Sequence, residues 1–397
     1  MRPETRQMRF ALRADEIDWS EAVKWSTPDL SRRAQLWIRK PGGRRLQASP
    51  VVRLLFIKPK HIGDALLLTP TLVAVKARYP EAVIWVLVRR GTESILAGCT
   101  AIDRVVTTAS VETKGWRLVA LYGDLQLVCK LRRQRFDYAF ELSDSDRGRW
   151  LAWWSGARQR VATRCHTQMN WIARRAITRF SDADWLHAHR VEKDFALVTE
   201  ALPLSLPVPP LAFNRERMAE WSPAAAVGEF AVLHPGTRWG RKRWPLERWI
   251  ALGKLLQARR LALVISSGPD AEEREIARLL QQALGPTVLN TDGQASWAQV
   301  AGLLGRARLF VGVDTAAMHL AAACQCPTVA LFGPSVVHFW RPWQVAHRVV
   351  LVGAARAAEQ EPDYLTRVAA LSTEAVTVAD VQAACGELLT AHAAGLR

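Results

Sequence analysis

The chain has 397 residues, of which 49% are hydrophobic and 23% charged, so it is too long for one ordinary domain and can bury two cores. Its 54 Lys and Arg against 37 Asp and Glu give a formal net charge of +17, which indicates an anionic partner such as nucleic acid, a membrane surface or a phosphorylated substrate. Six cysteines in so long a chain exclude a disulfide scaffold, and their spacing matches no metal site.

Residues 1–50 predict a basic extension outside the domains, with 11 basic and 6 acidic residues. Asp15, Glu16, Asp18 and Glu21 lie where a secretion signal would need its apolar segment, so we expect an uncleaved N-terminus and a reducing, cytosolic compartment. The extension is either a surface-binding segment or a partly ordered tail.

The first half of the chain alternates between strand and helix patterns. Residues 51–57 predict a strand, which is followed by a glycine and a helical pattern of apolar residues from 66 to 75. Further predicted elements are a strand at 83–88, a helix at 116–133 and a strand at 138–142. This alternation indicates a parallel sheet with helices on both faces.

Four prolines between residues 201 and 210 predict a linker, because they remove backbone donors and fix φ. The same alternation then restarts. The predicted strands are 230–233, 261–265, a short one near Val288, 309–311 and 328–332, and the predicted helices are 246–257, 272–284, 297–304 and 316–323. We expect an α/β protein of two doubly wound halves that face each other across a cleft, with ligands in the strand-to-helix loops.

The uncharged stretch 315–340 is long enough to resemble a membrane-spanning helix. Pro327 and the cluster at 333–335 interrupt it, and 329–332 predict a buried strand instead.

The loop after the first strand combines cations with a glycine and an aspartate. Gly63 allows close backbone approach, and Asp64 would lie at a helix N-terminus, where the helix dipole favours its ionised form. An ionised carboxylate at the mouth of a cleft suits a general base, although an N-cap without chemistry fits the same pattern.

The loop at 234–245 predicts a phosphate-binding cradle. It holds two glycines, Thr237 and four cations, among them Arg241 and Lys242, before a helix with Pro245 in its first turn. The ending of a Walker A loop is missing, and a solvated basic turn is the alternative.

Two later loops in the second half are further candidates. Ser267 and Gly268 lie in a turn that enters an acidic helix, which suits a base or ribose but also an ordinary helix entry. Asp314 or Thr315 can cap the helix that follows the strand at 309–311, and His319 lies on the same helical face as Thr315.

Two Asp-x-Asp pairs, 144/146 and 182/184, could hold Mg²⁺ for a nucleotide-sugar. Neither follows a buried strand in the second half, so we expect no divalent metal site.

Taken together, these segments resemble glycosyltransferase family 9, the bacterial lipopolysaccharide heptosyltransferases. Residues 53–87 are similar to the family's first strand–helix unit, with Gly63, Asp64 and Pro70 at its signature positions, and 233–249 and 310–335 are similar to its donor-site segments. The runs HFWRPW at 338–343 and 376–389 are similar to the heptosyltransferase III branch. The resemblance covers residues 51 to 392.

The resemblance implies a GT-B architecture. The domains would be a basic N-terminal extension at 1–50, a Rossmann-like acceptor-binding domain at 51–205 and a Rossmann-like ADP-sugar-binding domain at 206–397, with a last helix able to pack back on the N-terminal domain. It also implies inverting transfer of L-glycero-D-manno-heptose from ADP-heptose to the inner core of lipopolysaccharide. The organism would be a Gram-negative bacterium, and no cofactor would be required.

The resemblance also suggests roles residue by residue, with Asp64 as the catalytic base. The donor diphosphate would contact Thr237 and either Arg241 or Lys242. Asp314, Thr315 and His319 would complete the donor pocket. The loops themselves add Ser267 and Gly268 as donor candidates and Lys58, Lys60, His61 and Gly63 as acceptor candidates.

Three other functions stay open at this point. A family 9 transferase could act on a protein or another glycan. A nucleotide-sugar epimerase of the same fold would need a second acid/base pair, for which Glu141, Asp144 and His166 are available. The third is a non-catalytic, membrane-associated binder.

The positive charge is concentrated before the linker. Residues 1–50 carry +5; 51–210 hold 24 basic and 15 acidic residues, or +9; and 211–397 hold 19 and 16, or +3. This distribution favours phosphorylated lipopolysaccharide and the cytosolic face of the inner membrane as partners over nucleic acid.

Overall fold

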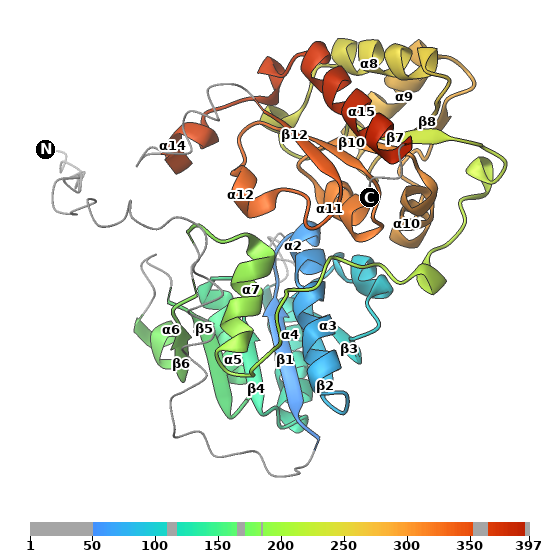
Figure 1. The fold of residues 1–397 in the computed structure, drawn as a ribbon. Coiled ribbons are helices and arrows are strands. Elements are labelled where there is room, and N and C mark those ends of the chain that lie inside the picture. The colour runs from blue at the N-terminus through green and yellow to red at the C-terminus, as the bar shows by residue number, and fades with distance from the viewer. Residues whose placement is uncertain (1–50, 109–116, 165–170, 184–185, 352–363, 394–397) are drawn as a thin grey trace, which may run out of the picture. The chain divides into compact units, whose positions relative to one another are not determined.

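The protein is described by a computed structural model that covers residues 51–108, 117–164, 171–183, 186–351 and 364–393. The predicted extension at 1–50, together with His166 and Asp184, lies outside the described residues. Residues 51–397 form one compact unit. It contains two parallel six-stranded sheets (Figure 1).

The first sheet has the strand order β3-β2-β1-β4-β5-β6. Its strands are β1 Arg53–Lys58, β2 Val83–Arg89, β3 Arg104–Thr108, β4 Tyr138–Glu141, β5 Gln159–Thr163 and β6 Arg179–Ser181. The β1 strand pairs with β2 on one side and with β4 on the other, Leu54 lying opposite Ile84 and Tyr138. The connections therefore change direction between β1 and β4, and ligands of such sheets bind beyond the carboxyl ends of these two strands.

Helices cover both faces of this sheet because the buried side chains of β1 alternate. Leu54 and Phe56 enter a core shared with α2, α3 and α7, whereas Leu55 and Ile57 pack with α4 and α5 on the other face. The helices of this half are α2 Ile62–Leu67, α3 Thr69–Arg78, η3 Glu93–Gly98, α4 Arg117–Arg133, α5 Asp146–Trp154, α6 Trp171–Arg175 and α7 Arg190–Thr199.

The second sheet has the order β12-β11-β10-β7-β8-β9. Its strands are β7 Phe230–His234, β8 Ala262–Ile265, β9 Leu289–Asn290, β10 Leu309–Val313, β11 Thr328–Phe332 and β12 His347–Leu351. Its direction changes between β7 and β10, which are paired in parallel. The loops after β7 and β10 are therefore the expected ligand loops, and they contain the predicted cradle and the 314–319 segment.

Two layers of helices also cover the second sheet. Its helical elements are η4 Arg215–Arg217, η5 Ser222–Ala224, η6 Gly240–Lys242, α8 Leu246–Ala258, α9 Ala271–Leu284, α10 Trp297–Arg306, α11 Ala316–Ala323, α12 Val337–Trp340, α14 Tyr364–Ala369, η7 Thr373–Ala375 and α15 Val378–Ala393. Ala231 and Leu233 pack with α8 and α15, while Phe230 and Val232 join the core of α10 and α11. That second core is continuous with the core of α2, α3 and α7.

The two doubly wound halves agree with the expected fold, and two local expectations have clear outcomes. The uncharged stretch divides into α11 and β11, and in the described part of the chain no helix could cross a membrane. No helix or strand occurs at 203–214, where the linker is predicted. The last helix, α15, packs against α8 and strands β10 to β12 of the second sheet.

Candidate active site

Asp64 lies in the first turn of α2, immediately beyond the carboxyl end of β1. Its side chain is largely buried, with 8% of the residue exposed. His61 is the N-cap residue of α2 and is exposed, but its side chain makes no capping hydrogen bond. The strand therefore delivers the predicted base to the expected ligand edge, and the cap position is taken by His61 rather than by the aspartate.

Gly63 lies at one of the points where the first half touches the second. A Cβ built on Gly63 would lie 3.1 Å from Cδ2 of His319 and 3.5 Å from Cα of Ala316. Helix α2 packs on α11 at this point. Because Gly63 has no side chain, the start of α2 can lie against the start of α11. This contact brings Asp64 in the first half close to His319 in the second half.

His319 is almost completely buried, and its Nδ1 has no hydrogen-bond partner among the described residues. Burial lowers its pKa, while the nearby carboxylates of Asp314 and Asp64 act in the opposite direction. Its ring centroid is 6.4 Å from that of Trp340. The imidazole is therefore neutral near pH 7, with one ring nitrogen available to a ligand.

Lys242 and Asp314 join the two predicted donor loops. The Nζ atom of Lys242 lies 2.6 Å from Oδ2 of Asp314 and 3.4 Å from its backbone carbonyl. Arg241 points elsewhere, since its Nη1 donates to the carbonyl of Ala369 at 2.6 Å. The two cations that the sequence left as alternatives therefore have different partners: Lys242 lies beside Asp314, and Arg241 lies beside Ala369.

Backbone donors complete this region. Thr315 is the N-cap residue of α11 but gives it no side-chain cap, so the first N–H groups of the helix have no side-chain acceptor from the cap. Thr237 is buried, and its Oγ1 accepts a hydrogen bond from the backbone N–H of Trp239 at 3.3 Å. Together with Lys242, these groups provide several hydrogen-bond donors beside a helix N-terminus, which suits a phosphate.

The loop with Ser267 and Gly268 is held by a carboxylate that sequence reasoning missed. Glu273 lies in α9, and its Oε2 accepts from the backbone N–H of Gly268 at 3.1 Å. A Cβ on either Gly268 or Gly236 would lie 2.6 Å from the same oxygen, so both glycines allow close approach. Burial raises the pKa of Glu273. Its position three residues after the N-cap Asp270 was the available signal.

The predicted acceptor residues differ in exposure and pairing. Lys58 is 2% exposed and forms a buried ion pair with Asp194 of α7. Lys60 lies nearer the surface, 3.8 Å from Oδ2 of Asp144. Ser267, which is predicted to contact the donor rather than the acceptor, has a buried Oγ without a hydrogen-bond partner among the described residues. We therefore revise Lys58 to a structural support of the loop and retain Lys60 and His61 as candidate acceptor contacts.

The Asp-x-Asp aspartates are bound by cations. Asp144 pairs with Lys193, Asp146 with Arg149 at 2.8 Å, and Asp182 with Arg164 at 3.0 Å. Burial raises the pKa of Asp144, but the ammonium groups of Lys193 and Lys60 outweigh it and hold the pKa below its usual range. Among the residues that the structure covers, no group of three or more His, Cys, Asp or Glu is arranged to hold a metal ion.

Glu141, considered for an epimerase pair, is fully buried at the end of β4. Its Oε1 accepts from the backbone N–H of Ser143 at 2.8 Å, and burial raises its pKa. The pKa values of Glu141 and Asp144 are therefore shifted in opposite directions.

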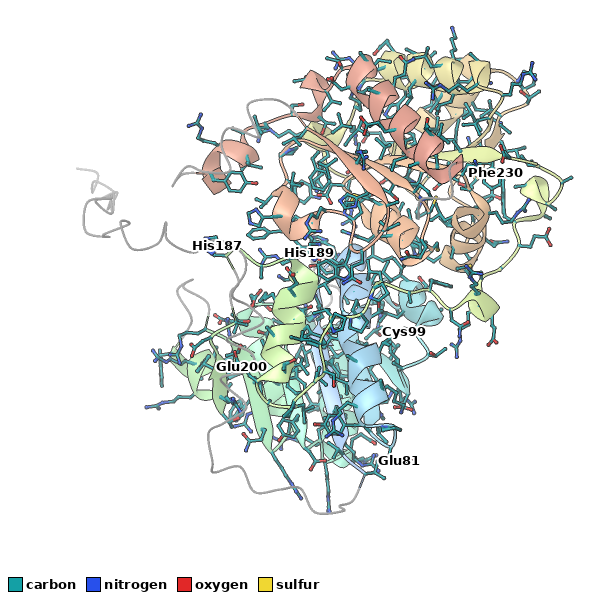
Figure 2. All side chains as sticks on the ribbon, in the orientation of Figure 1. Glu81, Cys99, His187, His189, Glu200 and Phe230 are labelled. Atoms are coloured by element: carbon teal, nitrogen blue, oxygen red, sulfur yellow. The ribbon has the colours of Figure 1, made fainter. Side chains whose placement is uncertain are left out.

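His189 connects the halves on another side of the site. It caps α7, where Figure 2 labels it, and its Nε2 lies 3.0 Å from the carbonyl of Arg341. Its ring stacks on Trp343 with centroids 4.7 Å apart. The HFWRPW run that the sequence singled out is thus the segment that meets the start of α7.

A family model for glycosyltransferase family 9 (heptosyltransferase) matches residues 125–367. The chain belongs to glycosyltransferase family 9. The chain is 27% identical over 288 residues to lipopolysaccharide heptosyltransferase 3 of Escherichia coli, covering 71% of this chain and 83% of that protein. It is also 27% identical over 288 residues to lipopolysaccharide heptosyltransferase 1 of Pseudomonas aeruginosa, covering 72% and 79%.

Solved structures agree with the fold of this family 9 glycosyltransferase. E. coli heptosyltransferase WaaC with ADP superposes with a TM-score of 0.70 at 20% identity, covering 85% of this chain and all of the other. E. coli ADP-heptose lps heptosyltransferase II gives a TM-score of 0.67 at 21% identity, covering 86% of this chain and all of the other. The family resemblance and the GT-B-like fold predicted from the sequence are confirmed.

Proposed function

We propose that this glycosyltransferase transfers L-glycero-D-manno-heptose from ADP-heptose to the inner core of lipopolysaccharide, with inversion. The observation that carries the proposal is the contact of Gly63 with the start of α11, because it brings Asp64 near His319 on the helix that follows the Lys242–Asp314 pair. The names of its relatives, which are lipopolysaccharide heptosyltransferases, support the choice of donor and acceptor.

Asp64 would act as the general base. As the acceptor oxygen attacks the anomeric carbon, the bond from that carbon to the diphosphate oxygen breaks, and the hydroxyl proton passes to the Asp64 carboxylate. A single in-line displacement of this kind inverts the anomeric configuration. The burial of Asp64 limits competing water in its surroundings.

The donor groups would stabilise the departing ADP, which gains negative charge as the bond breaks. Lys242 has three N–H donors, so it can hold Asp314 and a phosphate oxygen together. The uncapped N–H groups at the start of α11 and the Thr237 hydroxyl would share the diphosphate. The neutral His319 would contact the heptose through Nδ1, and Ser267 and Gly268 would receive the adenosine.

The acceptor would approach from the first half, where Lys60 and His61 are the candidate contacts. We place the enzyme at the cytosolic face of the inner membrane, because residues 51–210 carry +9 and the acceptor is a phosphorylated glycolipid.

The test is incubation of the purified protein with ADP-heptose and a series of truncated lipopolysaccharides. The expected product is one added heptose on one truncated core, detected by mass spectrometry, with its linkage and inverted configuration given by NMR. An incubation without acceptor serves as the control. Conversion of the heptose itself in that control would instead support an epimerase, and transfer to proteins alone would overturn the choice of acceptor.

A further inference from the structure

The helices on the two faces of the first sheet differ sharply in charge. Helices α4, α5 and α6 contain eight basic and two acidic residues. Helices α2, α3 and α7 contain four basic and three acidic residues. Helix α5 packs on both α4 and α6, so most of the positive excess of this half lies on adjoining helices.

The same helices expose large aromatic side chains. Trp153 and Trp154 at the end of α5 are 45% and 38% exposed, and Trp171 at the start of α6 is 64% exposed. Leu125 of α4 is also exposed. Of the four strongly exposed tryptophans in the described ranges, only Trp239 lies elsewhere. Three exposed tryptophans on two adjoining helices are unusual in a protein that has no partner for them.

Cations accompany these rings. The guanidinium carbon of Arg175 lies 5.1 Å from the ring centroid of Trp171. Arg174 and Arg175 are exposed, and neither forms an ion pair with a described carboxylate. We call Trp153, Trp154, Trp171, Arg174 and Arg175 the tryptophan–arginine surface.

We propose that the tryptophan–arginine surface docks on an anionic phospholipid membrane. Tryptophan rings favour the boundary between headgroups and acyl chains, and exposed guanidinium groups attract anionic headgroups. A flat apolar protein partner would not need the positive excess, whereas a lipid surface uses both features. The inference rests on the proposed function, since a glycolipid acceptor is presented at such a surface.

The surface belongs to the same half as the proposed base. Helix α5 begins directly after β4, whose carboxyl end borders the Asp64 loop, and runs back along the sheet, so Trp153 and Trp154 at its end lie toward the opposite edge. Docking through this surface would hold the acceptor-binding half at the membrane. The donor-binding half, which carries only +3 over residues 211–397, would meet a donor that is soluble.

The experiment measures co-sedimentation of the full chain with vesicles of phosphatidylglycerol and phosphatidylethanolamine, and with phosphatidylcholine vesicles. A combined Trp153→Ser, Trp154→Ser, Trp171→Ser variant is expected to lower binding to the anionic vesicles about tenfold. A combined Arg174→Glu, Arg175→Glu variant is expected to lower it by a similar factor, about tenfold. Trp239→Ser is the matched control, because it removes an equally exposed tryptophan from the other half.

Circular dichroism and thermal unfolding of each variant would establish that it folds. Wild-type affinity in both folded combined variants would overturn the proposal, and equal binding to phosphatidylcholine would overturn the part assigned to the arginines. Tight binding of a single-stranded RNA with no binding to vesicles would also overturn it.

Heptose transfer to a lipid-free core oligosaccharide separates this inference from the proposed function. The tryptophan variant is expected to keep this soluble activity and to lose activity on the acceptor embedded in vesicles. If the wild type transfers heptose to neither acceptor but binds vesicles through this surface, the proposed function fails and the docking surface stands.

Discussion

Gly63 has no side chain, and this allows α2, which carries Asp64, to pack closely on α11. A valine there would drive its branched Cβ into His319 and Ala316, which lie 3.1 and 3.5 Å from the Cβ position, and would push α2 away from α11. We expect Gly63→Val to lower kcat about a hundredfold while the protein stays folded, because Asp64 would lose its position relative to the donor. Steady-state kinetics and circular dichroism measure the two effects.

Gly228→Val is the matched control, because Gly228 is exposed and nothing lies within 4 Å of its Cβ position. Wild-type kcat in Gly63→Val would show that the contact with α11 does not align the base.

Lys242 and Arg241 are adjacent in sequence but point to different places, so they provide a matched pair. We expect Lys242→Ala to weaken ADP binding roughly 10- to 100-fold, the usual loss for a charge-assisted hydrogen bond. Arg241→Ala should change it less than about threefold, because its guanidinium holds the carbonyl of Ala369. Isothermal titration with ADP measures both, and a larger loss in the Arg241 variant would reverse the assignment.

At the scale of elements, His189 links α7 to the loop after α12. Burial lowers its pKa to about 3, and the nearby charge of Arg341 acts in the same direction. The unfolded chain takes up a proton on this imidazole below about pH 6.5, whereas the folded protein does not. The free energy of unfolding is therefore not reduced by His189 above pH 6.5, and it falls as the pH drops toward the folded-state pKa of about 3.

We expect the free energy of unfolding of the wild type to fall between pH 7 and pH 5 by about 2 kcal/mol more than that of His189→Asn. The buried His234 and His319 titrate in both proteins, so the difference isolates His189. Urea unfolding at the two pH values measures it. Equal pH dependence would mean that His189 is not held neutral in the folded state.

The elements divide clearly into those that sequence patterns predicted and those that they did not. Runs of apolar residues at β1, β2, β7, β10 and β11 identified the central strands, because both of their faces are buried. The short outer strands β3, β5 and β6 carry arginines and threonines such as Arg104 and Arg179, so they lack that signal. Helix α7 was also missed, although its start combines an N-cap with Glu192 at N3.

In the candidate site, the sequence predicted positions better than contacts. Asp64 and Asp314 were predictable because residues that follow the strands of a parallel sheet lie together at its carboxyl edge. The ion pair of Lys58 with Asp194 was not, because the two residues are 136 positions apart and local spacing carries no information about such a pair.

At the scale of the whole molecule, the charge of +17 is distributed so that the first half and residues 1–50 hold most of it. We expect binding to anionic vesicles to fall steeply as ionic strength rises from about 0.1 M to about 1 M, because the Debye length shrinks from about 10 Å to about 3 Å. Deleting residues 1–50 should weaken binding further. Vesicle sedimentation across a salt series measures both, and binding that is independent of salt would contradict an electrostatic origin.

The central claim is that a base in the first half acts on a donor held by the second half. The most direct test measures, for the Asp64→Asn variant, both the rate of heptose transfer and the affinity for ADP-heptose. The account predicts that transfer falls about a thousandfold or more, while the dissociation constant changes less than about threefold. Asp182→Asn, which alters an exposed carboxylate of the same half, should leave both unchanged. Transfer by Asp64→Asn at close to the wild-type rate would contradict the account.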